Sequence, residues 1–173
     1  MVLPRDYAGQ VCSLAKALEV VGERWTLLIV RDAFFGVRRF GDFVTHLGLP
    51  RAVLTERLGV LVAAGVLAKV PGQGRRSEYE LTDVGVSLWP VVRSLMTWGD
   101  DHYAPDGVRR EFWHSSDGGA LDGDGRCANC GAVVGVRDTV VAPGPGLGPP
   151  SDVADPVTVA LTRPHRLLRP LPR

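Results

Sequence analysis

The chain of 173 residues has few cysteines and no long apolar run. Three cysteines are an odd number and too few for the disulfide framework of a small secreted domain, so they favour a reducing cytoplasm. The longest apolar stretch, residues 60–68, is too short to cross a bilayer and is interrupted by Gly65. Residues 1–7 also lack a long apolar segment. Neither a secretory leader nor a membrane partner is expected.

A large net charge is absent as well, because the formal value is only +1. The distribution of charge is more informative. Residues 36–76 carry seven basic and two acidic side chains, a local excess of +5. The basic ones are Arg38, Arg39, Arg51, Arg57, Lys69, Arg75 and Arg76. Phosphates respond to local potential rather than to net charge, so this segment is a candidate for binding a polyanion.

The same region has the apolar spacing of two short helices followed by a hairpin. The first helix has apolar residues at i, i+3, i+4 and i+7: Phe40, Phe43, Val44 and Leu47. Gly48 ends it, Pro50 opens the next helix, and the second stripe is Leu54, Leu58 and Leu61. Residues 66–70 and 78–81 flank a turn-rich segment and predict two strands. A winged helix-turn-helix has this order, with a recognition helix at about 50–64 in the major groove and a wing at about 66–82 on the flanking backbone.

Further helices are predicted on both sides of this unit. Residues 11–21 form an amphipathic helix ended by Gly22, and residues 23–35 form a nearly all-apolar helix at the centre of the core. A last helix over residues 83–101 starts at the N-cap Thr82 and is kinked at Pro90. Its stripe is Leu88, Val92, Leu95 and Met96. The first and last helices either pack on each other or, as we expect, form a homodimer interface.

The composition changes after Tyr103, where glycines, prolines and acidic residues become frequent. We predict a winged-helix DNA-binding and dimerisation domain at 1–103. A small β-rich appendage follows at 104–142, and a Pro/Gly/Arg-rich tail, mostly extended or mobile, at 143–173. The expected fold class is mainly α with a small β wing, plus the β-rich C-terminal appendage.

Several motifs in order resemble those of the HxlR-type winged helix-turn-helix regulators, a bacterial family related to the MarR type. They are Gly-Glu-Arg-Trp-Thr-Leu-Leu-Ile at 22–29, Gly-Val-Arg-Arg-Phe-Gly-Asp-Phe at 36–43, the recognition-helix residues 54–61, and Glu-Tyr-Glu-Leu-Thr-Asp-x-Gly at 78–85. The resemblance covers residues 10–103. It implies a cytoplasmic, homodimeric transcriptional regulator that joins the nucleoid when bound to double-stranded DNA. The effector, a small molecule or a redox signal, is not specified.

Candidate DNA-contacting residues follow from this arrangement. With the leucine stripe facing inward, the outward positions near the start of the recognition helix are Arg51, Ala52, Thr55 and Glu56. Arg51 fits either a guanine contact or a phosphate clamp. Arg57 is expected in an ion pair within the domain. The remaining candidates are Arg38 and Arg39 before the first helix of the motif, and Arg75, Arg76 and Ser77 at the wing tip.

The cysteines suggest two further sites. Some members of the resembled family sense oxidants through an N-terminal cysteine, a role that would fall on Cys12, although a small buried hydrophobe is the alternative. Cys127-x-x-Cys130 has the spacing of one zinc knuckle. Resembled regulators with such tails carry a second knuckle, which here corresponds to His114 and Asp117. The four residues would form a mixed structural zinc site, unless the turn has kept its shape without metal. No cofactor is required otherwise.

Two other functions compete with DNA binding. A thiol-disulfide oxidoreductase would use Cys127 and Cys130, but these residues do not lie in the expected βαβ pattern. A winged-helix protein-interaction module would be expected to lack the basic residues found here. No nucleotide-binding loop, nucleophile elbow or HExxH motif occurs, so the chain is not expected to be an enzyme.

Overall fold

A computed structural model describes residues 7, 9–72, 76–148 and 154–172. Its N-terminal part contains the following elements in order: α1 (Ser13–Val21), α2 (Thr26–Phe34), α3 (Phe40–Leu47), α4 (Arg51–Ala63), β1 (Leu67–Pro71), β2 (Ser77–Leu81), α5 (Asp83–Val86) and α6 (Trp89–Tyr103). The C-terminal part contains β3 (Arg110–His114), η1 (Val136–Asp138), β4 (Thr139–Pro143), η2 (Pro145–Leu147), α7 (Pro156–Ala160) and β5 (His165–Arg166). Mainly helical elements and two small antiparallel sheets confirm the predicted fold class.

The helix-turn-helix has the predicted bounds. Gly48 follows α3 in the left-handed conformation, with φ 62° and ψ 28°, which a residue without a Cβ adopts readily. Pro50 is the N-cap of α4, so that helix begins one residue later than Pro50. The α4 stripe of Leu54, Leu58 and Leu61 is fully buried, as predicted from its spacing.

The wing is an antiparallel hairpin in which Leu67 lies opposite Leu81 and Pro71 opposite Ser77. The amide of Tyr79 in β2 donates to the carbonyl of Arg38 over 2.8 Å, so the chain before α3 adds to the base of the hairpin. Thr82 caps the helix that follows by accepting from the amide of Gly85 over 3.2 Å. The hairpin is thereby attached at both ends to the helical core.

The prediction of one long helix after the wing, kinked at Pro90, is wrong. The chain forms the short α5, leaves the helix at Ser87 and Leu88, and starts again as α6. Pro90 lies in the first turn of α6, where its missing amide hydrogen costs no intrahelical hydrogen bond. Proline therefore begins a helix here instead of bending one.

The C-terminal region forms a second sheet with the strand order β3-β4-β5. Phe112, Val141 and Leu167 from this region are buried in the same apolar cluster as the helices of the winged unit. Trp89 lies between the two parts, with its ring centroid 5.0 Å from that of Phe34 and 5.6 Å from that of Phe112. One continuous core therefore joins the winged unit to the appendage.

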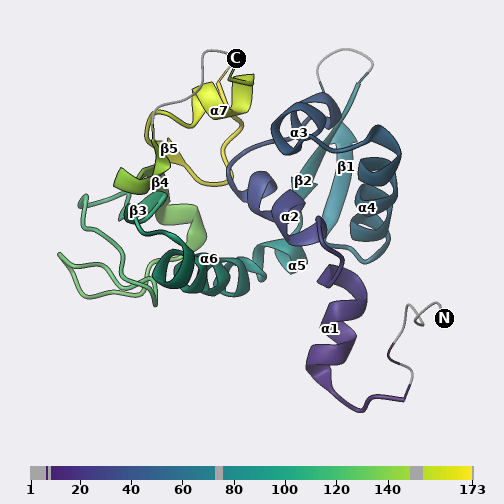
Figure 1. The fold of residues 1–173 in the computed structure, drawn as a ribbon, viewed down its shortest axis with the longest axis horizontal. Helices are drawn as coiled ribbons and strands as arrows, with labels where there is room; N and C mark the ends of the chain where they lie inside the picture. Colours follow the sequence, from purple (N-terminus) through teal and green to yellow (C-terminus); the bar gives the residue numbers. More distant parts are fainter. Residues whose placement is uncertain (1–6, 8, 73–75, 149–153, 173) are drawn as a thin grey trace.

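The tail contains a short helix and a short strand, which the sequence did not predict. Residues 154–172 form α7 and β5 and return to the winged unit beside α3 (Figure 1). The amide of Leu168 donates to the carbonyl of Phe34 over 2.8 Å, and that of Leu171 to Gly36 over 3.2 Å. The sequence did not predict this packing because the apolar residues of the tail have no regular spacing and become buried against distant elements, including α3 and β4.

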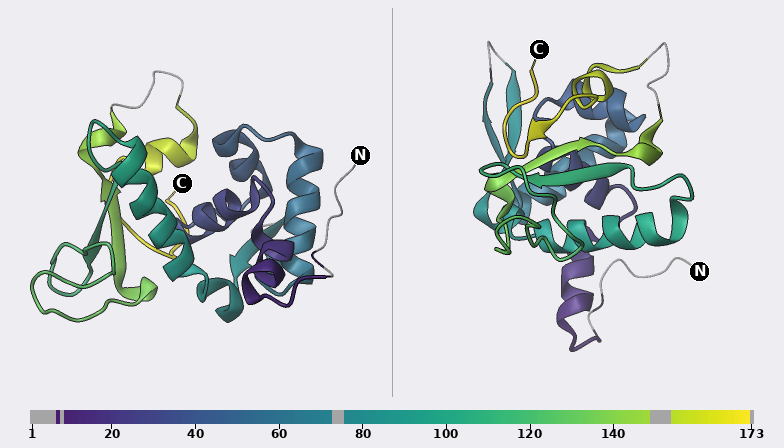
Figure 2. Two further views of the ribbon diagram at one scale, coloured as in Figure 1. Left: turned by 60° about the horizontal axis from the view of Figure 1, so that its bottom comes forward. Right: turned by 90° about the vertical axis from the view of Figure 1, so that its left-hand side faces the viewer.

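The first helix extends away from the rest of the molecule. Figure 1 shows α1 below the body of the protein, and the right-hand view of Figure 2 shows the same projection from another side. Only Ala15 and Val21 of this helix are buried. Among the described residues, no helix combines the length and hydropathy needed to cross a membrane.

Gly36 provides a test of the packing of the tail. It has φ 94°, and a Cβ at this position would lie 2.0 Å from the carbonyl oxygen of Arg169. Gly36→Ala should lower the free energy of unfolding by about 2–6 kcal/mol, since backbone strain and overpacking each cost about 1–3 kcal/mol. Urea denaturation measures this loss.

Gly48→Ala is the matched control. Gly48 also has positive φ, but nothing lies within 4 Å of an added Cβ. We expect a loss of only about 1–2 kcal/mol from the left-handed backbone. Equal losses in the two variants would contradict close packing of the tail on Gly36.

Candidate DNA-binding surface and cysteine cluster

The outer face of α4 carries the residues that the sequence assigned to DNA. Arg51, Ala52, Thr55 and Glu56 are all exposed. The guanidinium of Arg51 lies 4.8 Å from the ring centroid of Phe40, and the hydroxyl of Thr55 donates to the carbonyl of Arg51 over 2.9 Å. Arg51 forms no ion pair with any other described residue. Its charge is therefore available at the start of the helix.

Arg57, on the same helix, is held within the domain as predicted. Its guanidinium pairs with Glu56 and lies 3.9 Å from a carboxylate oxygen of Glu23. These contacts keep the side chain at the edge of the core, with only 12% of it exposed.

Arg38 and Arg39 contact the wing instead of extending freely into solvent. Arg38 pairs with Glu80 and donates to the carbonyl of Leu168 over 3.3 Å. Arg39 pairs with Glu78 through Nε at 3.3 Å. Each arginine therefore links the entry to α3 with strand β2. Their contact with DNA stays a prediction.

At the wing tip, Arg76 and Ser77 are exposed, whereas Arg75 lies outside the described residues. The carbonyl of Arg76 accepts from the amide of Gly72 over 2.9 Å, which closes the base of the tip. In Figure 1, α4 begins at the end of the molecule toward which the wing extends. A recognition helix and a basic wing tip lie at the same end of the molecule. This arrangement suits a DNA duplex whose major groove receives the helix and whose flanking backbone contacts the wing.

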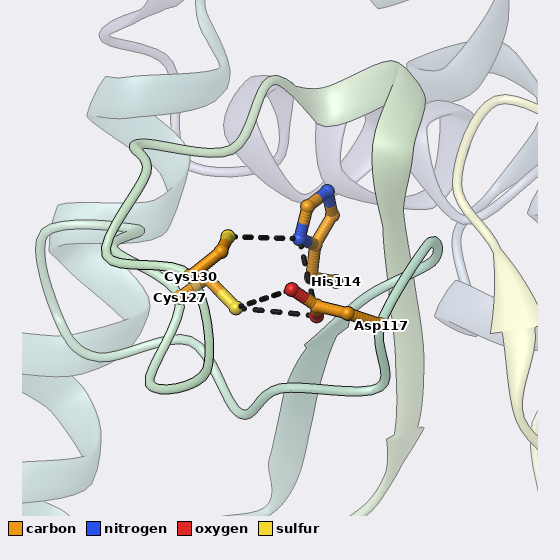
Figure 3. Close-up of side chains that lie close together, drawn as sticks. All are labelled: His114, Asp117, Cys127 and Cys130. Atoms are coloured by element: carbon orange, nitrogen blue, oxygen red, sulfur yellow. Dashed lines mark hydrogen bonds and ion pairs between the residues drawn. The ribbon is translucent and has the colours of Figure 1, made fainter.

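A second candidate site lies in the appendage, where four side chains from two turns converge (Figure 3). They are His114, Asp117, Cys127 and Cys130, and one ligand-type atom from each lies within 4.8 Å of all the others. His114 Nδ1 is 3.2 Å from Asp117 Oδ1 and 3.5 Å from Cys130 Sγ. The thiol of Cys127 donates to Asp117 Oδ1 over 3.3 Å. The structure thus brings together the four residues named from the sequence.

Asp117 is the most perturbed acid of this cluster. The backbone amide of Gly119 donates to its carboxylate over 2.9 Å, and this contact contributes most to lowering the pKa of Asp117 to about 2. The thiols of Cys130 and Cys127 and the His114 ring lower it further. The group is therefore a carboxylate, the form that binds cations.

Comparison with known proteins identifies the winged unit. The pattern of the family described as HxlR-like helix-turn-helix matches residues 20–106. This chain belongs to that family. Rv3095 of Mycobacterium tuberculosis, an uncharacterized HTH-type transcriptional regulator, is 44% identical over 137 residues, which cover 78% of this chain and 87% of Rv3095. An alignment of that length necessarily extends beyond the winged unit into the C-terminal region.

Solved structures of related proteins agree with this family assignment. PA1607, a candidate transcription factor, has a TM-score of 0.61 and 38% identity, covering 74% of this chain and 92% of its own. The redox regulator HypR in its oxidized form has a TM-score of 0.50 and 26% identity, covering 53% of this chain and 97% of its own. The relatives of this HxlR-like chain are transcriptional regulators, and none of these comparisons indicates catalysis.

The apolar surface of this HxlR-like chain gathers on α1 and α6. Leu14 is 66% exposed on α1, while Leu95 and Trp98 are 49% and 52% exposed on α6. Val92, which the sequence assigned to the dimer interface, is buried in the protomer's own core because its side of α6 packs toward α2. That assignment is wrong for Val92, and Leu88 and Met96 also pack against the core.

Cys12 is a free, exposed thiol at the N-cap of α1. The alternative of a small buried hydrophobe is therefore wrong, since the helix begins outside the core. Its role as a redox sensor stays a prediction.

Sequence reasoning missed a buried polar cluster between α2 and the tail. Asp32 has no exposed surface, lies 2.6 Å from Arg31 Nη2, and burial raises its pKa. His46 joins it to the tail, with Nε2 3.9 Å from Asp32 and Nδ1 3.2 Å from Asp155. A cavity of about 790 Å³ lies beside this cluster. The only feature of the sequence that could have indicated this cluster was the adjacent charged pair Arg31 and Asp32 within an otherwise apolar helix.

Proposed function

We propose that this chain is a sequence-specific, homodimeric DNA-binding regulator of transcription. The observation that carries the proposal is the exposed face of α4, where Arg51 has no ion-pair partner among the described residues and the wing extends to the same end of the molecule. Membership of a helix-turn-helix family and relatives named as transcriptional regulators support it. Arg51 would read or clamp the duplex in the major groove, and Arg76 would contact the flanking backbone.

The dimer is supported by the exposed apolar residues of α1 and α6. A helix of nine residues is too short to be stable in water by itself, and α1 buries only two of its side chains in the protomer. A second copy packed on α1 and α6 would cover this surface. It would also place two α4 helices for successive major grooves, which raises affinity beyond that of one module.

Neither of the competing functions has comparable support. Cys127 and Cys130 lie in a turn, and not at the strand-to-helix junction on which thiol-disulfide exchange proteins of the βαβ type depend. A protein-interaction module would not need an exposed arginine at the start of α4 that has no ion-pair partner in the described part of the chain.

DNA binding can be tested with a duplex selected from random sequences by repeated binding. Fluorescence anisotropy should give tighter binding to this duplex than to a scrambled one, with a steep salt dependence. If Arg51 contacts a base, Arg51→Ala should weaken the free energy of binding to the selected duplex by about 1–3 kcal/mol and that to the scrambled duplex by less. Arg76→Ala should weaken both equally and reduce the salt slope by about one, because one phosphate is then no longer neutralised.

Arg137→Ala is the control for the removal of a positive charge. Arg137 is exposed and pairs with Asp83 on α5, away from the wing tip. This substitution should leave the affinities for the selected and the scrambled duplex unchanged. Failure to select any duplex, or equal effects of the three substitutions, would contradict the proposed interface.

The dimer makes a separate prediction. Leu14→Glu and Leu95→Glu would place a charge in the proposed interface, so each should convert a dimer into monomers in sedimentation equilibrium. Val159→Glu is the control, because Val159 is 54% exposed on α7, outside the proposed interface. A monomeric parent protein, or dimers that survive both interface substitutions, would exclude this arrangement.

A second candidate function is redox sensing through Cys12. It is favoured by the exposed thiol on α1 and by the similarity to HypR, which is described as a redox regulator. Two Cys12 thiols of a dimer would lose two protons and two electrons to an oxidant such as diamide and form one disulfide between subunits. Mild diamide treatment should then give a covalent dimer on a non-reducing gel and lower DNA affinity.

Cys12→Ser should abolish the covalent dimer, whereas the double variant Cys127→Ser/Cys130→Ser should retain it. A covalent dimer that persists in Cys12→Ser would assign the oxidation to the appendage. Its absence in the parent protein would exclude a disulfide between subunits.

A further inference from the structure

The cysteine cluster is built from two turns with the same spacing. The first runs from the end of β3, where the amide of Gly118 donates to the carbonyl of His114 over 2.9 Å. In the second, the amide of Gly131 donates to the carbonyl of Cys127, also over 2.9 Å. Each turn presents two ligand-type side chains three residues apart. Two such turns facing one another give four donors around one point (Figure 3).

The distances between these donors suit a tetrahedral ion. Zinc bonds of about 2.3 Å to sulfur and about 2.0–2.2 Å to nitrogen or oxygen place tetrahedral ligand atoms roughly 3.3–3.8 Å apart. The contacts of Asp117 Oδ1 with His114 and Cys127 are 3.2 and 3.3 Å, and that of Cys130 with His114 is 3.5 Å. These three donor contacts are already near the separations that a bound zinc ion would require, and all four donors lie within 4.8 Å of one another.

The chemistry of the donors narrows the choice of metal. Two thiolates, one imidazole and one carboxylate form a mixed set that is too soft for magnesium or calcium. With both thiols ionised and the imidazole neutral, the site carries a formal charge of −3, which a divalent ion largely neutralises. Four protein ligands leave no open position, so the metal would serve structure and not catalysis.

Groups around the cluster already hold the ligands in place. The Ser116 hydroxyl lies 2.9 Å from His114 Nε2 and 3.3 Å from Nδ1, and Nδ1 also faces Asp117 and Cys130. The amide of Gly119 fixes one oxygen of Asp117, and the side chain of Asn129 donates to the Asp117 carbonyl over 3.0 Å. Such outer contacts orient the ligands of metal sites and set the imidazole tautomer.

The surrounding chain consists of turns between β3 and η1. Its described strand pairings are isolated bridges, such as Leu121 with Cys127, and further backbone hydrogen bonds close the turns, as from the amide of Asp122 to the carbonyl of Arg126 over 3.1 Å. Cys127 is 2% exposed, with its thiol directed at Asp117. A structural metal bound in such an irregular segment contributes its binding energy directly to folding.

We propose that His114, Asp117, Cys127 and Cys130 bind one structural zinc ion that joins the two turns of the appendage. The metal is independent of the DNA-binding proposal, since all four ligands lie outside the winged unit. It extends the protein's function to a metal site whose loss would loosen the appendage while the recognition helix remains intact.

The first test is the metal content of protein prepared without an affinity tag and dialysed against metal-free buffer. Mass spectrometry of the metals should find one zinc per chain. Cobalt added to the metal-free protein should give the visible bands of a tetrahedral ion and near-ultraviolet bands of cobalt–thiolate bonds. Protein that retains no zinc and gives cobalt no thiolate bands would overturn the proposal.

Variants then identify the ligands. Cys127→Ser/Cys130→Ser should remove the zinc, whereas Cys12→Ser, the matched cysteine control, should keep it. Asp117→Asn should weaken zinc affinity by at least about tenfold, the lower limit for loss of an outer-shell partner alone. Asp117→Cys should strengthen it by creating a Cys₃His set, in competition with a chromogenic chelator.

If the Cys127→Ser/Cys130→Ser variant does not fold, the Asp117→Cys variant still tests whether these residues bind zinc. A gain in affinity requires position 117 to face the ion. Unchanged affinity in both Asp117 variants, or zinc retained by the double cysteine variant, would place the metal elsewhere and overturn the proposal.

Discussion

The fold depends on the burial of α2, a helix with almost no side that can face water. Ile29, Val30 and Phe34 are fully buried, so other elements must cover most of this helix, apart from the side that lines the cavity beside Arg31. The helix-turn-helix and wing cover part of it, and α6 covers another part. The C-terminal sheet and tail complete the enclosure, with Leu168 bonded to the last turn of α2. Because one helix is shared by both parts, the position of the helix-turn-helix is tied to the packing of residues more than a hundred positions away.

The sequence was sufficient to predict those elements whose apolar residues repeat at regular intervals. The leucine stripe of α4 has a period that only a helix satisfies, and the glycine after α3 marks a left-handed turn. The sequence was not sufficient to predict segments that are stabilised by residues far away along the chain. The tail has short apolar runs between its prolines, and Leu167 becomes a core residue only where the tail meets distant parts of the chain, with its amide bonded to the carbonyl of Thr139 in β4. Pro90 was misread because proline is compatible with both a kink and a first turn, and the choice depends on whether the preceding residues can leave the helix.

The two candidate sites differ in how far sequence could define them. Ligand-type residues repeat at three-residue spacing in both turns of the appendage, so the sequence could name the set, and the fold then determines that the turns face one another. Arginines near the recognition helix were harder to assign, since charge alone does not distinguish a phosphate contact from an internal brace. Arg38 lies against Glu80 and Arg57 against Glu56, while Arg51 extends over Phe40 at the surface. The acidic partners decide this division: Glu80 comes from the wing, whereas Glu56 neighbours Arg57 on α4 itself.

The return of the tail to α3 has a consequence for synthesis of the protein. A chain leaves the ribosome from its N-terminus, and residues near the C-terminus emerge last. Leu161 and Leu167 are core residues synthesised long after α2 and α3. The apolar surface that they cover therefore remains exposed until these residues have been synthesised. Nascent chains of this protein should be clients for chaperones that bind exposed apolar segments. A chain that stops before residue 161 would lack both leucines and leave this surface open to proteolysis.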